Sequence, residues 1–172
     1  MKLTGVLIAI YFAIINSCSV VEAGVSWHPP LVHGALNPAV TQANIDSTIC
    51  VKNWTDTIRP DTRYTNAIKY DQMAFLNIRW EDRKKYEEDH WIALSIGGAP
   101  KDKFNLVLIP YFGKCNANDK NRLEGVLHRM VCAKPRQITL ARAQHEMQHD
   151  WAKSYNLHVA SLKRKIPKLV CN

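Results

Sequence analysis

The sequence contains no apolar run long enough to cross a bilayer as a helix, which takes about 20 residues. The apolar run over residues 5–15 is shorter, follows Lys2 and precedes the small-residue pattern Val-Glu-Ala at residues 21–23. That arrangement is typical of a secretory signal peptide, so we expect residues 1–23 to be removed on export. An uncleaved membrane anchor is the alternative. Export predicts a secreted or periplasmic protein.

The sequence also lacks internal repeats and low-complexity segments, which excludes solenoids and disordered arrays. After the leader, the chain has the usual size of one domain and can bury an ordinary core. Residues 24–40 contain two adjacent prolines, Pro29 and Pro30, and are expected to form an extended arm. Residues 41–172 are expected to form a single domain with a basic C-terminal tail.

No two cysteines are spaced as C-x-x-C, which argues against a structural zinc site, the competing interpretation. Removing the leader leaves an even number of cysteines in an exported chain: Cys50, Cys115, Cys132 and Cys171. Two disulfides are therefore predicted. Three pairings are possible, and the residues alone do not choose among them. We expect Cys50 to pair with Cys132 and Cys115 with Cys171.

Acidic residues are few: 15 stand against 23 Lys and Arg, for a net charge of +8. They cluster over residues 81–89, and the last of them is Asp150, so the C-terminal segment 151–172 is basic only. A positive field favours polyanionic partners, nucleic acid first and anionic lipid or wall polymers second.

The pattern of apolar residues predicts an α+β fold. Helical spacing indicates helices near residues 65–76, 120–132 and 140–155, the last with an apolar stripe of Leu140, Ala143, Met147 and Trp151. Alternation at Ile92, Leu94 and Ile96 predicts a strand, ended by the glycines at 97–98. The segment "NLVLIP" at 105–110 predicts a second strand, which would complete a hairpin.

The candidate catalytic residues are Asp89 and His90, which directly precede the predicted hairpin. Hydrolysis of a phosphodiester needs an activated water and a cation that neutralises developing charge. Histidine is a suitable base near neutral pH, and a carboxylate can hold a hard divalent cation. Neighbouring strand residues point to opposite faces, so these two can share one pocket only if the chain bends or bulges there.

The order of Asp89-His90, residues 92–98, Asn105-Leu106 and a helix beginning "KNRLE" resembles the HNH endonucleases. Over about residues 41–155, segments such as "TICVKNWTDTIRP" and "VCAKPRQITLARAQ" are similar to small exported bacterial proteins that carry an HNH-type "EDHLIPLELGG" segment. The resemblance implies a ββα-metal core, a β-hairpin and a helix around one metal ion, with further helices and disulfides. The chain departs from that group at Ala93 and Ser95.

By this resemblance, His90 is the general base and Asn105 braces the loop that carries it. Asp89 is a metal ligand. A second ligand is expected at the start of the helix, where Asn121 is preferred over Asn118 and Asp119. Such oxygen ligands suit one Mg²⁺ or Mn²⁺ ion. The implied function is metal-dependent endonuclease activity, on DNA in preference to RNA. Nearby cations could contact phosphates or form an ordinary solvated surface: Lys101, Lys103, Lys114, Lys120 and Arg122.

Two other functions stay open. A catalytically inactive nucleic-acid-binding module would keep the fold and the charge. The segment "HEMQH" at 145–149 fits the H-E-x-x-H pattern of zinc proteases. Against the protease, His145 and His149 are predicted to lie opposite the apolar stripe, in solvent, and no third ligand follows at a suitable spacing. Asn121 could instead be a helix cap, with Glu124 completing a capping box.

Overall fold

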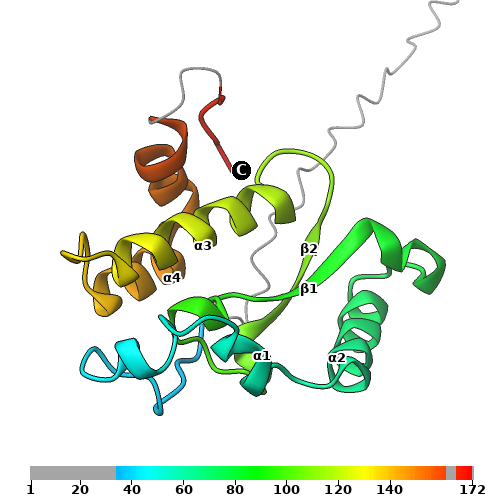
Figure 1. The fold of residues 1–172 in the computed structure, drawn as a ribbon. Coiled ribbons are helices and arrows are strands. Elements are labelled where there is room, and N and C mark those ends of the chain that lie inside the picture. The colour runs from blue at the N-terminus through cyan, green and yellow to red at the C-terminus, as the bar shows by residue number, and fades with distance from the viewer. Residues whose placement is uncertain (1–33, 162–165, 172) are drawn as a thin grey trace, which may run out of the picture.

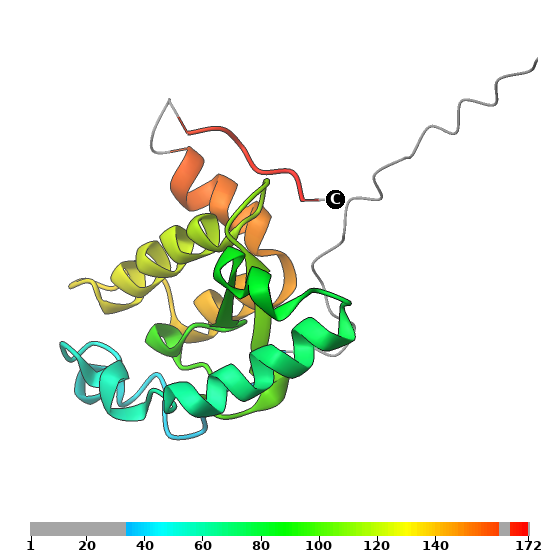
Figure 2. The same cartoon turned by 90° about the vertical axis from the view of Figure 1, so that its right-hand side faces the viewer.

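The computed structural model describes residues 34–161 and 166–171. The predicted signal peptide and residues 24–33 of the predicted arm lie outside the described residues. A two-stranded antiparallel hairpin lies between helix α2 on one side and the pair α3 and α4 on the other (Figure 1, Figure 2). The mixed fold with its antiparallel hairpin confirms the α+β prediction at this coarse level.

The α-helices of the described residues are α1 (Trp54–Ile58), α2 (Thr62–Phe75), α3 (Ala117–Cys132) and α4 (Leu140–Tyr155). All except α1 begin at side-chain caps that the sequence supplies. The side chains of Asp61, Asn116 and Thr139 accept hydrogen bonds from backbone N–H groups in the first turns of α2, α3 and α4. Because Asn116 caps α3, this helix begins before the predicted start at residue 120, and the capping-box interpretation of Asn121 is wrong.

The predicted first strand is wrong in position. Strand β1 is Tyr86–His90, and it pairs with β2, Leu106–Pro110, in a regular register that places His90 opposite Leu106. Residues Leu94–Ile96, predicted as strand, form a 3-10 helix. They lie in a segment that is buried almost continuously from Trp91 to Ala99, so their alternation does not reflect one buried and one solvated face. The second strand is confirmed.

The core lies mainly between α3, α4 and the loop that follows β1. The stripe of α4 is buried as predicted, and α3 contributes the buried residues Leu123, Leu127 and Val131. His145 and His149 lie exposed on the other side of α4, which confirms that expectation. The packing of α3 on α4 thus holds α3 in place beside β1.

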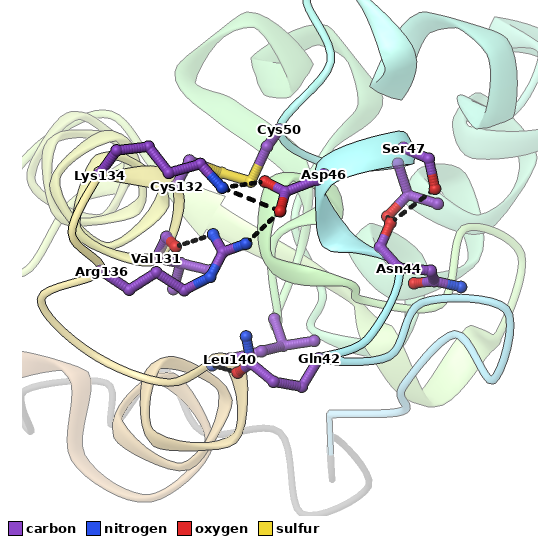
Figure 3. A network of polar contacts seen from close by, with 11 residues as sticks. Gln42, Asn44, Asp46, Ser47, Cys50, Val131, Cys132, Lys134, Arg136 and Leu140 are labelled. Carbon is purple, nitrogen blue, oxygen red and sulfur yellow. Dashed lines mark hydrogen bonds and ion pairs between the residues drawn. A yellow bond between two sulfur atoms is a disulfide. The ribbon is translucent and has the colours of Figure 1, made fainter.

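Two disulfides join Cys50 to Cys132 and Cys115 to Cys171, which confirms the expected pairing. The first bridge ties the N-terminal part of the described chain to the end of α3. Beside it, Asp46 accepts hydrogen bonds from Lys134 and Arg136, and Gln42 accepts one from the backbone N–H of Leu140 (Figure 3). Disulfides of this kind are typical of proteins in oxidising compartments.

Among the residues that the structure describes, no helix combines the length and the apolar character that a bilayer span requires.

Candidate functional site

Strand β1 separates two groups of polar side chains. Residues 87 and 89 point toward α3, where Glu87 accepts a hydrogen bond from Asn121 and Asp89 binds Lys120. Residues 88 and 90 leave the opposite face, on which Glu88 accepts a hydrogen bond from Gln72 of α2. The ladder is regular through His90, so the bulge that a shared Asp89 and His90 pocket would need is not present.

His90 is held by the loop between the strands. Its Nε2 atom lies 3.0 Å from the carbonyl oxygen of Pro100, and its ring is 5 % exposed. A carbonyl can only accept, so Nε2 carries the proton and Nδ1 keeps the lone pair. Nδ1 makes no hydrogen bond with any described residue. The ring orientation and the tautomer are therefore both set by one backbone carbonyl.

The charge state of His90 follows from its surroundings. Burial lowers the pKa of His90 below its usual value, although the Pro100 carbonyl and the charge of Asp89 act in the opposite direction. The guanidinium of Arg59, just after α1, lies close enough to add to the lowering, as does Lys120. His90 is thus a neutral imidazole near neutral pH, and the exposed Arg59 is near enough to influence it.

Asn105 makes three hydrogen bonds to the backbone of the loop that follows β1. Its side-chain oxygen accepts the backbone N–H of Ile92 at 2.8 Å. Its amide nitrogen donates to the carbonyls of Ile92 and Ala99 at 3.1 and 2.9 Å. The side chain is 0 % exposed, so these bonds replace water for three buried backbone groups. Both ends of the loop between His90 and Pro100 are fixed by this one residue.

Asp89 takes part in a buried ionic cluster with α3. One of its oxygens accepts the backbone N–H of His90 at 2.7 Å, and the other lies 2.6 Å from the Nζ atom of Lys120. The same ammonium donates to the His90 carbonyl at 2.7 Å and to the carboxylate of Glu124. Lys120, expected among the surface cations, is 0 % exposed.

The electrostatics of this cluster favour the charged lysine. Burial by itself would lower the pKa of Lys120, but the charges of Asp89 and Glu124 outweigh it and raise the pKa above its usual value. Burial raises the pKa of Glu124, with Asp89 adding to the effect and Lys120 opposing it. Burial and Asp89 likewise raise the pKa of Glu87. The acids around Lys120 therefore compete for one cation.

The predicted metal ligands do not form a metal site in this arrangement. Both oxygens of Asp89 have partners, and the amide nitrogen of Asn121 is turned to Glu87 at 3.1 Å. Of the two other candidates, Asn118 is exposed, and Asp119 pairs with Arg122 at 3.5 Å. No group of three His, Cys, Asp or Glu side chains within residues 34–161 and 166–171 is arranged to hold a metal ion. As arranged, these residues do not fit a divalent ion. Binding of such an ion through Asp89 and Asn121 stays a prediction from the resemblance.

The two histidines and the glutamate of the H-E-x-x-H segment have different surroundings on α4. The exposed rings of His145 and His149 stack on each other with centroids 4.0 Å apart. Glu146 is buried, and Ser154 and His158 donate to its carboxylate at 2.5 and 2.8 Å, while Arg142 also pairs with it. Because these partners occupy its carboxylate, Glu146 is not free to act as a base beside the two histidines.

No protein-family model matches the chain, and no curated protein or solved structure is significantly similar to it.

Sequence reasoning gave no role to Arg59, and it assigned Glu124 to a capping box and Lys120 to the surface cations rather than to a buried ion pair. The spacing of Lys120 and Glu124 is that of an ion pair on one helical turn, which was the available signal. The burial of Lys120 depends on the position of β1, and the apolar pattern predicted this strand at the wrong residues. The other expected cations are exposed, which both a phosphate contact and an ordinary solvated surface require: Lys101, Lys103, Lys114 and Arg122.

The pH dependence of stability tests the surroundings of Glu88, which lies on the face of β1 that contacts α2. Burial raises the pKa of Glu88 to about 8, and one of its oxygens is buried without a partner among the described residues. A raised folded-state pKa gives stability that is complete below the unfolded value of 4.5 and is lost as pH rises through about 8. We expect Glu88→Gln to raise the free energy of unfolding at pH 8 by about 4 kcal/mol, since folding raises the pKa of Glu88 from 4.5 to about 8 and one pKa unit is worth about 1.4 kcal/mol.

At pH 4, where the glutamate is protonated in both states, the Glu88→Gln variant and the unmodified chain should unfold at the same denaturant concentration. Urea titrations followed by tryptophan fluorescence at several pH values measure the difference. A stability difference that does not change between pH 4 and pH 8 would contradict the assignment of a raised pKa to Glu88.

Proposed function

We propose that the chain is a nuclease that hydrolyses phosphodiester bonds within nucleic acid, DNA in preference to RNA, with His90 as the base that activates water. The observation that carries the proposal is the setting of His90: a neutral imidazole whose Nε2–H is held by the Pro100 carbonyl, which leaves Nδ1 as the basic atom. The resemblance to HNH endonucleases assigns the same role to this residue.

The reaction follows from this arrangement. Nδ1 of His90 takes a proton from water, the resulting hydroxide attacks phosphorus, and the bond between phosphorus and the leaving oxygen breaks. The leaving oxygen takes a proton from solvent. Asn105 holds the loop in place, so the ring needs no reorientation during the reaction.

Positive charge near His90 would stabilise the phosphate. Arg59 lies near His90, and Lys101 follows the carbonyl that holds the ring. A guanidinium matches the geometry of two phosphate oxygens and stays charged at any working pH. The net charge of +8 favours approach of a polyanion, and contacts would fall mainly on the phosphate backbone.

The divalent ion that the resemblance implies supplies, when bound, Lewis-acid stabilisation of phosphate charge. Because Asp89 and Asn121 have other partners here, no step above passes through such an ion. An assay with and without chelator separates the two cases.

Replacing His90 by glutamine is the direct test. The glutamine amide can still donate to the Pro100 carbonyl, but it cannot accept a proton at neutral pH. We expect nicking of supercoiled plasmid DNA by the purified chain to fall by about 100-fold or more, the usual contribution of a general base. The relaxed and linear products are quantified on gels against time.

The control is His149→Ala, which removes an exposed histidine of α4 and should leave nicking unchanged. Thermal unfolding of both variants shows whether a loss reflects misfolding. Nicking by His90→Gln at the rate of the unmodified chain would refute the role of His90.

The inactive binding module is the second candidate, favoured by one observation: the carboxylates beside β1 are neutralised by Lys120 rather than left open to a cation. It predicts salt-dependent DNA binding without nicking under any condition, with or without divalent ions. A nicking rate that depends on His90 excludes it.

A further inference from the structure

Lys120 has all the partners that its ammonium can use. The group carries three N–H donors, and three oxygens lie around it: one each from Asp89, Glu124 and the His90 backbone. The side chain is fully buried. Burying an ammonium is unfavourable unless it is paired and hydrogen-bonded, and here both conditions are met.

The cluster has the composition of a small cation site. Two carboxylates and a carbonyl converge from β1 and α3 on one point, which is the oxygen set that hard cations select. That point is taken by the end of a lysine that belongs to the same helix as Glu124. A divalent ion could bind these oxygens only after the ammonium left them.

Leaving is difficult for this lysine. The aliphatic part of Lys120 is enclosed with the ammonium, so moving it would open a void between β1 and α3. If the ammonium stayed nearby, it would repel a dication across a few ångströms of protein. An ordinary surface ion pair between residues 120 and 124 would show neither the burial nor the third contact with the His90 carbonyl.

We propose that the Lys120 ammonium is a built-in cation that closes the oxygen cluster of Asp89, Glu124 and the His90 carbonyl to divalent metal ions. Lys120 acts as a positioning residue. It joins α3 to the backbone of the residue that carries the imidazole, and being fully buried it does not contact a substrate. The inference goes beyond the proposed nuclease function and does not depend on it.

The test is Mn²⁺ binding by the full chain and its Lys120→Met variant. Methionine fills similar space without charge and leaves the two carboxylates with no cation. We expect no saturable Mn²⁺ site at the cluster in the unmodified chain. The variant should bind one Mn²⁺ more tightly than the unmodified chain by about tenfold or more, since the repelling charge is gone. The electron paramagnetic resonance signal of free Mn²⁺ measures the binding, and a rise of the melting temperature with Mn²⁺ reports it independently.

The matched control is Lys69→Met. Lys69 lies near Glu87 and Glu88 and donates to the Tyr86 carbonyl, but it does not occupy the cluster. It should gain no Mn²⁺ site. Adding Asp89→Asn to Lys120→Met should abolish the gained binding. Failure of a folded Lys120→Met to gain Mn²⁺, or an equal gain with Lys69→Met, would overturn the proposal.

If Lys120→Met does not fold, Mn²⁺ binding by an Asp89→Asn variant of the otherwise unmodified chain tests the proposal instead. The proposal expects it to leave Mn²⁺ binding unchanged, because the cluster holds no metal to begin with. Loss of a Mn²⁺ site on that substitution would overturn it. Metal binding is measured without DNA, so its outcome stands apart from the nicking assay. Where both proposals hold, nicking continues in the presence of EDTA.

Discussion

Replacing Asn105 by alanine is expected to lower the free energy of unfolding by about 3–5 kcal/mol, since each buried backbone group left without a partner costs about 1–3 kcal/mol. Three groups are affected, the N–H and carbonyl of Ile92 and the carbonyl of Ala99. The loss would be a large part of the stability of a domain this size. Urea unfolding followed by tryptophan fluorescence measures it.

The Asn105→Ala variant should also lose nicking where it remains folded, because the loop that positions Pro100 against His90 is no longer fixed. Asn118→Ala is the matched control: it truncates an exposed asparagine on α3 and should change stability by less than about 0.5 kcal/mol. Equal stability of the two variants would show that the side chain of Asn105 does not hold the loop.

Removing the bridge between Cys50 and Cys132 is the second large effect. The bridge joins residues 82 apart in the sequence, and a loop of that length corresponds to about 4 kcal/mol of stabilisation. We expect the Cys50→Ala and Cys132→Ala double variant to unfold at a markedly lower urea concentration than the unmodified chain. The midpoint and slope of the transition give the value.

Asp46→Asn provides the comparison at the same junction. It weakens the contacts with Lys134 and Arg136 that lie beside the bridge (Figure 3), but Asp46 and Lys134 are largely exposed, and such pairs contribute little. Its effect should be far smaller than that of the disulfide variant. If the two effects were equal, the ion pairs and not the covalent bond would hold the N-terminal segment to α3.

Helices α2, α3 and α4 were predictable because their signals are local, whereas α1 was not predicted. The apolar stripe of α4 and the cap of Thr139 lie within a few residues of each other, and the predicted and observed bounds of that helix agree. The second strand was predictable for a similar reason, since five consecutive apolar or small positions follow Asn105. The cysteine pairing was expected correctly, although the residues alone left three possibilities.

The first strand was not predictable from periodicity. Its residues, Tyr86–His90, are mostly polar because both faces of β1 contact side chains of neighbouring helices rather than a continuous apolar core. The strand is defined by pairing with β2, a contact across the chain. Because the strand was predicted at the wrong residues, the contacts of Lys120 with Asp89 and the His90 carbonyl were not predicted either.

The amide of Asn105 braces the loop after His90 in the structure, and its role in the reaction stays a prediction. The chemical roles of His90, Asp89 and Asn121 stay predictions. The resemblance placed Asp89 and His90 in one pocket, whereas a regular ladder directs them to opposite sides of the strand.

The groups that hold the His90 ring and the loop after it, the Pro100 carbonyl and the Asn105 amide, come from a single short stretch, residues 90–105. Neither disulfide contributes to that stretch. Chemical reduction should therefore make the molecule easier to melt while the imidazole keeps its alignment at temperatures where the chain is still folded. Loss of heat resistance and loss of turnover are then separable properties of this protein.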